Sequence, residues 1–230
     1  MRSQFTLLLV TLIGLQLALP LVATTPWGLV SQAALTWCAV AASVWTIESW
    51  RTRSFGLLLA GLALTADVLI WTTDATPLMP VGRILVAAVL GLVTCVIVEH
   101  VLTREDVTFD VVIGGVCTYL LVGTFFAQVY AAFEIVAPGS LLERGGPLSA
   151  VGPTDLARGH IVEVFYYSFA TLTTLGYGDV IPATPMTRAV STVEALIGQI
   201  YPAILIAHLV GVRAARGPVR RRHDAEHGSS

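Results

Sequence analysis

The residues best placed to act on a ligand form one short run from Thr173 to Asp179, with the sequence TTLGYGD. Its two glycines alternate with larger residues and permit left-handed backbone without the steric penalty of a Cβ atom. The run follows a short helical pattern, residues 160–173, and precedes a long apolar stretch. Non-helical backbone at membrane depth is tolerated only where it is buried in protein or lines a water-filled path. The spacing therefore predicts a re-entrant segment whose chemistry comes from its backbone.

The composition indicates that this segment is set in a membrane. The chain has 230 residues, of which 55% are hydrophobic and 12% charged, against about 25% charged in an average soluble domain. A soluble enzyme is therefore not expected. The net charge of −2 provides no basic field for nucleic acid. Cys38, Cys95 and Cys117 lie in apolar runs and have no metal-ligand spacing, so neither a disulfide framework nor a zinc site is predicted, and no cofactor is expected.

Six stretches are long and apolar enough to cross a bilayer, which takes about 20 helical residues. Because backbone groups in lipid must pair internally, all six are predicted to be helices. They are, approximately, Phe5–Val22, Val30–Ile47, Phe55–Trp71, Val81–Val98, Phe109–Phe133 and Ala189–Val212. The first stretch has a second interpretation, a cleaved signal peptide, which would leave five spans.

The run TTLGYGD resembles the signature of potassium channels, Thr-Val-Gly-Tyr-Gly with a following Asp. The resemblance extends over Ser168–Pro182, with a pore helix, a filter, an Asp and a later Pro. It implies a filter over residues 174–178 in which neutral, inward-facing backbone carbonyls replace the water around K⁺. The filter residues are Thr174, Leu175, Gly176, Tyr177 and Gly178, with the Thr174 hydroxyl as the innermost ligand.

The resemblance also implies a supporting shell behind the filter. Tyr166 and Tyr167 are expected to form an aromatic cuff against Tyr177, while Thr173 and Asp179 support the two ends of the filter. Asp179 is expected at the outer mouth with a hydrogen bond behind the filter; the alternative is a solvated loop carboxylate. Ala170 stands where some family members carry a glutamate.

The last apolar stretch is expected to be the inner helix of the pore. Gly198 follows Asp179 by nineteen residues, which matches the glycine hinge of the family, although a packing role is the alternative. Helical periodicity and the bend at a proline place four further residues near the cavity or its gate. These residues are Gln199, Pro202, Ile206 and Val210.

Three ionisable residues inside predicted spans are expected to be paired or functional. Glu194 should face the pore helix, as a brace or as a proton sensor. Asp67 and Arg83 are expected to pair, as a structural contact rather than a sensor. The steps of three residues after Arg83 carry no further arginine, and steep voltage gating needs three to four charges per subunit. Weak or absent voltage gating is therefore predicted.

The arginines predict the orientation. Threading six spans places nine of the thirteen on one side, which by the positive-inside rule puts both termini in the cytoplasm. The basic tail Arg213–Arg222 is expected either to attract anionic lipid or only to anchor the topology.

Together these features predict an all-α membrane protein of the plasma membrane with six transmembrane helices. An N-terminal four-helix unit, residues 1–104, resembles a degenerate voltage sensor. A pore domain, residues 105–212, follows, and then a cytoplasmic tail, residues 213–230. The pore domain comprises an outer helix, about 109–133, an external loop, 137–159, a pore helix, about 161–173, the filter and an inner helix, about 189–212. One filter per chain implies a homotetramer that conducts K⁺ passively. The alternatives are a regulatory or silent subunit of another potassium channel, or the membrane part of a transporter.

Overall fold

A computed structural model describes residues 4–23, 28–47, 49–73, 78–104, 108–143, 145–148 and 161–215. Its helices are α1 (Gln4–Ala23), α2 (Gly28–Trp45), α3 (Trp50–Thr73), α4 (Met79–Thr103), α5 (Phe109–Val136), α6 (Ile161–Leu172) and α7 (Pro185–Ala215). Three short strands accompany them: β1 (Leu141–Glu143), β2 (Gly146–Pro147) and β3 (Val180–Pro182). A helix lies at each of the six apolar stretches and at the short pattern before the filter run.

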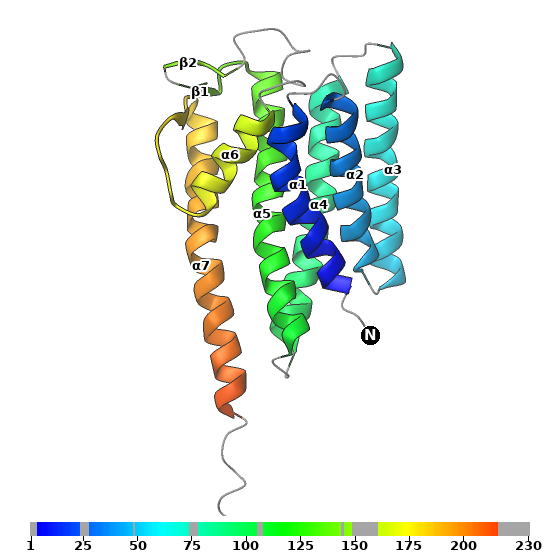
Figure 1. Ribbon diagram of the computed structural model, residues 1–230, viewed down its shortest axis with the longest axis vertical. Coiled ribbons are helices and arrows are strands. Elements are labelled where there is room, and N and C mark those ends of the chain that lie inside the picture. The colour runs from blue at the N-terminus through cyan, green and yellow to red at the C-terminus, as the bar shows by residue number, and fades with distance from the viewer. Residues whose placement is uncertain are drawn as a thin grey trace, which may run out of the picture.

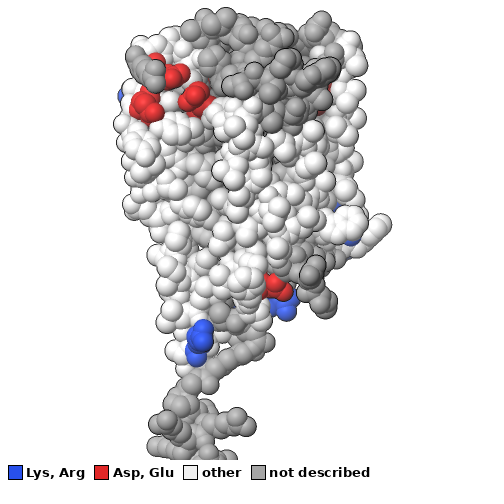
Figure 2. Space-filling view, in the orientation of Figure 1, with Lys and Arg blue, Asp and Glu red and all other residues white. Residues whose placement is uncertain are grey.

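The long helices run side by side, with the strands at one end (Figure 1). The helix α1 begins at the end of the molecule where α7 terminates (Figure 1). Figure 2 shows a wide belt of one face without charged side chains, with acidic residues near the strands on one side of it and arginines, together with an acidic patch, toward the other end. Among the described residues, four helices are long and apolar enough to cross a membrane, namely α3, α4, α5 and α7. Shorter apolar runs, Phe5–Leu21 and Ala34–Trp45, lie within α1 and α2.

The helix α5 is the centre of the packing. It makes its most extensive contact with α4 and also contacts α1, α6 and α7. The helix α1 buries one face made of leucines at helical spacing, Leu8, Leu12, Leu15 and Leu19. The described residues 1–104 thus pack against the outer helix of the same chain, which follows α4 after a short connection.

Two glycines on α5 let the neighbouring elements approach closely. A Cβ atom at Gly123 would lie 2.6 Å from the ring of Phe169 on α6, and one at Gly115 would lie 2.6 Å from Leu205 on α7. A side chain at either position would therefore require the ring of Phe169 or the side chain of Leu205 to shift. Small residues at such contacts are typical of helix packing in membranes.

Several boundaries differ from those expected from the apolar runs; α4, for example, ends at Thr103 rather than near Val98. The inner helix α7 begins at Pro185 rather than near Ala189. The reason is a cap, because Thr184 Oγ1 accepts from Thr187 N at 3.2 Å and proline suits the first helical position. The helix α3 begins at Trp50 rather than near Phe55. Its first turn is polar, so a search for apolar runs does not include it.

The fold is also not wholly α-helical. In the described part of the loop expected over residues 137–159, β1 pairs with β2 as an antiparallel hairpin, and β1 also pairs with β3 beyond the filter. Gly139 and Gly145, with φ of 84° and 86°, make the tight turns that this requires. Strands of two or three residues carry no hydrophobic alternation that would reveal them in a sequence.

Candidate functional site

The run from Thr173 to Asp179 leaves the end of α6 as extended, non-helical backbone. Thr174, Gly176 and Gly178 have positive φ, at 57°, 54° and 81°, and Thr174 is the one non-glycine residue with positive φ in the described chain. Leu175 and Tyr177 lie between them with ordinary φ. In a regular strand successive carbonyls point in opposite directions, and reversing the handedness of every second residue turns them toward one side. The geometry is suited to a line of oxygen ligands.

The amide groups of this run are used to anchor it. Leu175 N and Gly176 N donate to Ala170 O at 2.9 and 3.2 Å, and Thr174 N donates to Thr171 O at 2.9 Å. Across the described residues, none of the carbonyl oxygens from Thr174 to Gly178 accepts a protein hydrogen bond. The residues that carry these oxygens are exposed in the single chain, so the oxygens are available to a cation.

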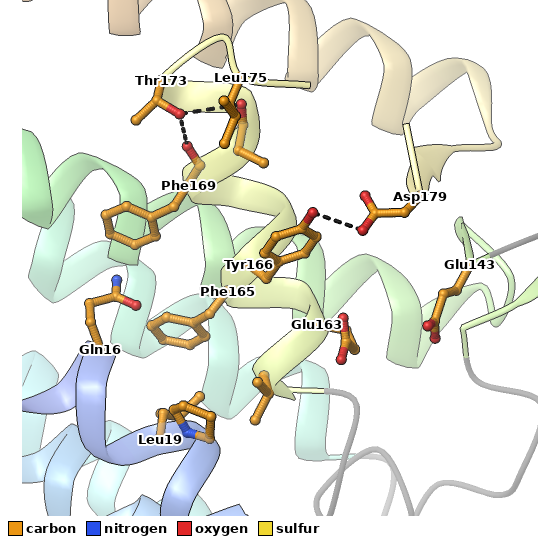
Figure 3. A pocket seen from close by; sticks show the side chains of 13 residues that line it. Gln16, Leu19, Glu143, Glu163, Phe165, Tyr166, Phe169, Thr173, Leu175 and Asp179 are labelled. Carbon is orange, nitrogen blue, oxygen red and sulfur yellow. Dashed lines mark hydrogen bonds between the residues drawn. The ribbon is translucent and has the colours of Figure 1, made fainter. Parts of the chain in front are cut away.

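Tyr166 supports the outer part of the run. Its ring stacks on that of Tyr177 with centroids 6.4 Å apart and an interplanar angle of 7°. Its hydroxyl donates to Asp179 Oδ2 at 2.8 Å (Figure 3). That hydrogen bond raises the pKa of Tyr166 to about 12, so the donor stays protonated across the physiological range. Thr173 Oγ1 donates to Phe169 O at 2.7 Å at the other end of the run.

Tyr167 does not join this support within the chain. It is buried on the opposite side of α6, where its hydroxyl lies 2.5 Å from Ser191 Oγ on α7. Its ring meets Tyr130 of α5 edge to face at 5.0 Å. Adjacent residues on a helix point about 100° apart, so two consecutive tyrosines cannot both face Tyr177. The expected cuff is thus formed by Tyr166 alone within one chain.

Glu194 joins three helices. Its side chain, 0% exposed, accepts from Ser168 Oγ of α6 at 2.5 Å and from Tyr130 Oη of α5 at 2.6 Å. Ser168 Oγ also lies 2.8 Å from Gly123 O of α5. In the described part of the chain no basic side chain is bonded to this carboxylate, and its partners are hydroxyl groups. Glu194 therefore ties the inner helix to the pore helix.

Gly198 lies one turn further along the same face of α7. A Cβ atom there would come 1.8 Å from Leu172 O, the last residue of α6. The same carbonyl accepts from Tyr119 Oη of α5 at 3.1 Å. The observed contact supports the packing role of Gly198, because no other residue allows α7 to approach the end of the pore helix so closely.

The remaining inner-helix residues lie away from the packed side of α7. Gln199, Ile206 and Val210 are exposed and Pro202 is half-buried. Large apolar side chains of α7 share this exposure: Val193, Leu196, Ile200 and Ile204. One side of α7 is therefore unpartnered within a single chain.

Asp67 and Arg83 lie next to one another without a direct hydrogen bond. Asp67 Oδ2 accepts from Trp37 Nε1 at 3.2 Å, while Arg83 Nη1 donates to Gln128 Oε1 at 3.3 Å. A Cβ atom at Gly82 would lie 3.3 Å from Asp67 Oδ1, so the carboxylate does face α4. The expected pair is thus loose, and Arg83 instead bonds α4 to the pore domain.

A pocket of about 640 Å³ opens beside α6 on its α1 side (Figure 3). Tyr166, Ala170 and Asp179 line it, so it adjoins the support of the filter run. Gln16 of α1 also lines it, and Gln16 Nε2 is buried with no hydrogen-bond partner in the described chain. The small side chain of Ala170 leaves this space open behind the run.

Several residues of this site were not singled out from the sequence. They are Tyr119, Gly123, Tyr130, Glu134, Ser168 and Ser191. Tyrosine and serine are frequent in apolar helices, so their types alone are weak signals. Glu134 could have been singled out from the sequence, because an ionisable side chain within an apolar run is functional or paired by default.

Comparison with known proteins finds similarities in the second half of the chain. Residues 107–212 match the Ion_trans_2 family, described as ion channel. The inward rectifier potassium channel Kirbac3.1 of Paramagnetospirillum magnetotacticum is 30% identical over 118 residues, which cover 51% of this chain and 34% of that protein. The matched region thus spans about a third of that relative's length. No solved structure matches the chain. Residues 107–212 are therefore similar to an ion channel family, and the chain is a membrane protein that has a potassium channel among its distant relatives.

Proposed function

We propose that four copies of this chain form a potassium-selective pore that conducts K⁺ passively across the plasma membrane. The observation that carries this proposal is the run from Thr174 to Gly178, where the handedness of the backbone alternates and no carbonyl accepts a hydrogen bond from the described part of the chain. A ring of four such runs provides the neutral oxygen cage that a dehydrated K⁺ requires. The similarity to a potassium channel supports the choice of ion.

The unpartnered side of α7 supports the tetramer. Its exposed side includes large apolar residues from Val193 to Val210, and Leu175, 55% exposed, and Tyr177, 69% exposed, are also apolar or aromatic. A filter of one chain has ligands on one side only, so the site is incomplete without other copies. In the tetramer, Gln199, Ile206 and Val210 line the cavity and its gate, and Pro202 bends the helix near them.

We extend the proposal to six spans with both termini in the cytoplasm. The leucine face of α1 is part of the core, so α1 belongs to the folded molecule. Arg53 lies over the ring of Trp45 with its guanidinium carbon 4.7 Å from the centroid, a contact suited to the membrane interface at the cytoplasmic end. Arg104 follows the end of α4, and Arg213 lies in the last turn of α7 on that side. The described start of the basic tail, Arg213, is exposed and suits anionic lipid.

Voltage gating is weak in this proposal. Arg83 is hydrogen-bonded to Gln128 of α5, and α4 carries no second arginine. Moving one charge across the whole membrane potential is worth about 2.3 kcal/mol per 100 mV, far less than a steep sensor requires. The packing of α4 on α5 within one chain supports a four-helix unit that lies beside its own pore domain rather than a neighbour's.

The test is K⁺ flux into liposomes that contain this chain alone. Flux that is blocked by Ba²⁺ and is lost in Gly178→Ala, which strains a positive-φ position, supports the proposal. Assembled protein that passes no K⁺ by itself but does so with a second channel chain would instead identify a silent or regulatory subunit.

A further inference from the structure

The strand β3 fixes the chain immediately beyond the filter run. It begins at Val180, the residue after Asp179, and pairs with β1 in the register Glu143 to Val180 and Leu141 to Pro182. The segment that directly follows the filter run is therefore paired with a strand from the loop after α5. The position of Gly178 depends on where β1 is held.

A buried glutamate holds β1. Glu134 lies in the last turn of α5 and is 0% exposed. Its Oε1 accepts from Gly139 N at 2.7 Å and its Oε2 accepts from Leu141 N at 2.9 Å. The two oxygens of one carboxylate thus bind both sides of the turn that leads into β1.

This arrangement stabilises the turn rather than the helix. A carboxylate in the last turn of a helix meets the negative end of the helix dipole, which is unfavourable for α5 itself. Hydrogen bonds from backbone amides to a carboxylate are strong and directional. With both oxygens engaged, the chain from Gly139 to Leu141 has little freedom to shift relative to α5.

The residue between these two amides extends the connection to the inner helix. Ser140 O accepts from Ala183 N at 2.9 Å and from Thr187 Oγ1 at 3.1 Å. Ala183 follows β3, and Thr187 lies in the first turn of α7. The segment bound by Glu134 is therefore bonded both to the exit of the filter and to the start of α7.

We infer that Glu134 is a positioning residue for the outer end of the selectivity filter, acting through β1 and β3. This inference rests on the proposed function, since it names the residue that keeps the outer carbonyls of that filter in register. It assigns to a side chain of the outer helix a part in ion selectivity, although that side chain is not a filter residue.

The test compares Glu134→Gln with Glu99→Gln in the full chain reconstituted in liposomes. Glu134→Gln keeps the shape but turns an amide donor toward a backbone N–H, which leaves one buried donor without an acceptor. Glu99 is exposed near the end of α4 and matches the change in charge. The readout is the K⁺/Na⁺ permeability ratio from the reversal potential, which does not depend on how many channels assemble.

Glu134→Gln is expected to lower that ratio at least about fivefold, the scale set by one unsatisfied buried donor, and Glu99→Gln is expected to leave it unchanged. Hydrogen exchange at residues 139–143 and 180–183 should accelerate by a similar factor, with exchange in α6 unaffected. If Glu134→Gln does not assemble, Glu134→Asp, which keeps the carboxylate but shortens its reach, is measured in the same way.

An unchanged permeability ratio in either assembled variant overturns the inference, even if the tetramer is less stable. Absence of K⁺-selective flux in the wild-type chain overturns the proposed function instead, so the two failures are distinguishable.

Discussion

Substitution of Gly198 by alanine tests the contact between the inner helix and the pore helix. The new Cβ atom would lie 1.8 Å from Leu172 O. Raising that distance to the 3.4 Å at which ordinary contact begins requires a separation of about 1.6 Å between α7 and the end of α6. The same displacement would lengthen the hydrogen bond from Ser168 to Glu194 from 2.5 Å to about 4.1 Å, which is no longer a hydrogen bond.

The expected cost follows from both effects. Overpacking of this kind destabilises by about 1–3 kcal/mol, and a buried carboxylate that loses a hydrogen bond adds about 1–3 kcal/mol. Because Leu172 lies two residues before Thr174, the displacement should reach the inner end of the filter. Gly198→Ala is therefore expected to lower both the thermal stability of the assembled protein and its K⁺/Na⁺ permeability ratio.

The matched control is Gly211→Ala, on the same helix, where an added Cβ atom meets nothing within 4 Å. Both substitutions raise helix propensity equally, so propensity cancels in the comparison. A pure hinge at Gly198 predicts a change in open probability with selectivity and melting temperature unaltered. Equal melting temperatures and equal permeability ratios in the two variants would refute the close-packing account.

Three further outcomes are expected. Arg83→Ala leaves Gln128 Oε1 buried without its donor and should cost about 1–3 kcal/mol of stability. The steady-state current–voltage relation should keep its shape. A current that depends less steeply on voltage in Arg83→Ala than in the wild type would contradict this expectation. Tyr166 has its pKa raised from 10.0 to about 12 by the hydrogen bond to Asp179, so the stability that this bond contributes is present below pH 10 and lost as the pH rises toward 12. Alkaline melting curves of wild type and Tyr166→Phe should therefore converge in that range, and parallel curves would disprove the assignment. Glu194→Ala removes the acceptor of two hydroxyl hydrogen bonds and should reduce assembly more than Thr192→Ala, an exposed position on the same helix; size-exclusion profiles measure the difference.

The long helices can be predicted from the sequence because backbone N–H and C=O groups in lipid must form their hydrogen bonds within the same segment. Each apolar run is a helix in the structure, and the chain leaves helical geometry where Gly176 and Gly178 alternate with larger residues. Helical periodicity also explains why Glu194 and Gly198, four residues apart, lie on one face of α7 and meet successive turns of α6.

Contacts between distant segments could not be predicted in this way. From the sequence, the consecutive Tyr166 and Tyr167 are expected to contact the same neighbour. In the structure the turn of the helix directs them toward different ones, Tyr177 and Tyr130. The strand β1 has no sequence signal because its stability comes from Glu134 and from β3, both remote in the chain. Arg83 forms its hydrogen bond with Gln128 rather than with Asp67 because α4 packs closely on α5. This tertiary contact cannot be predicted from hydropathy.

The central claim is that the carbonyls from Thr174 to Gly178, one set from each of four chains, select K⁺. Its most direct test is the reversal potential of the purified chain in a planar bilayer with K⁺ on one side and Na⁺ on the other. The account predicts a reversal potential far from zero, in the direction of K⁺ selectivity. A reversal potential at zero, with Na⁺ carried as readily as K⁺, would contradict it.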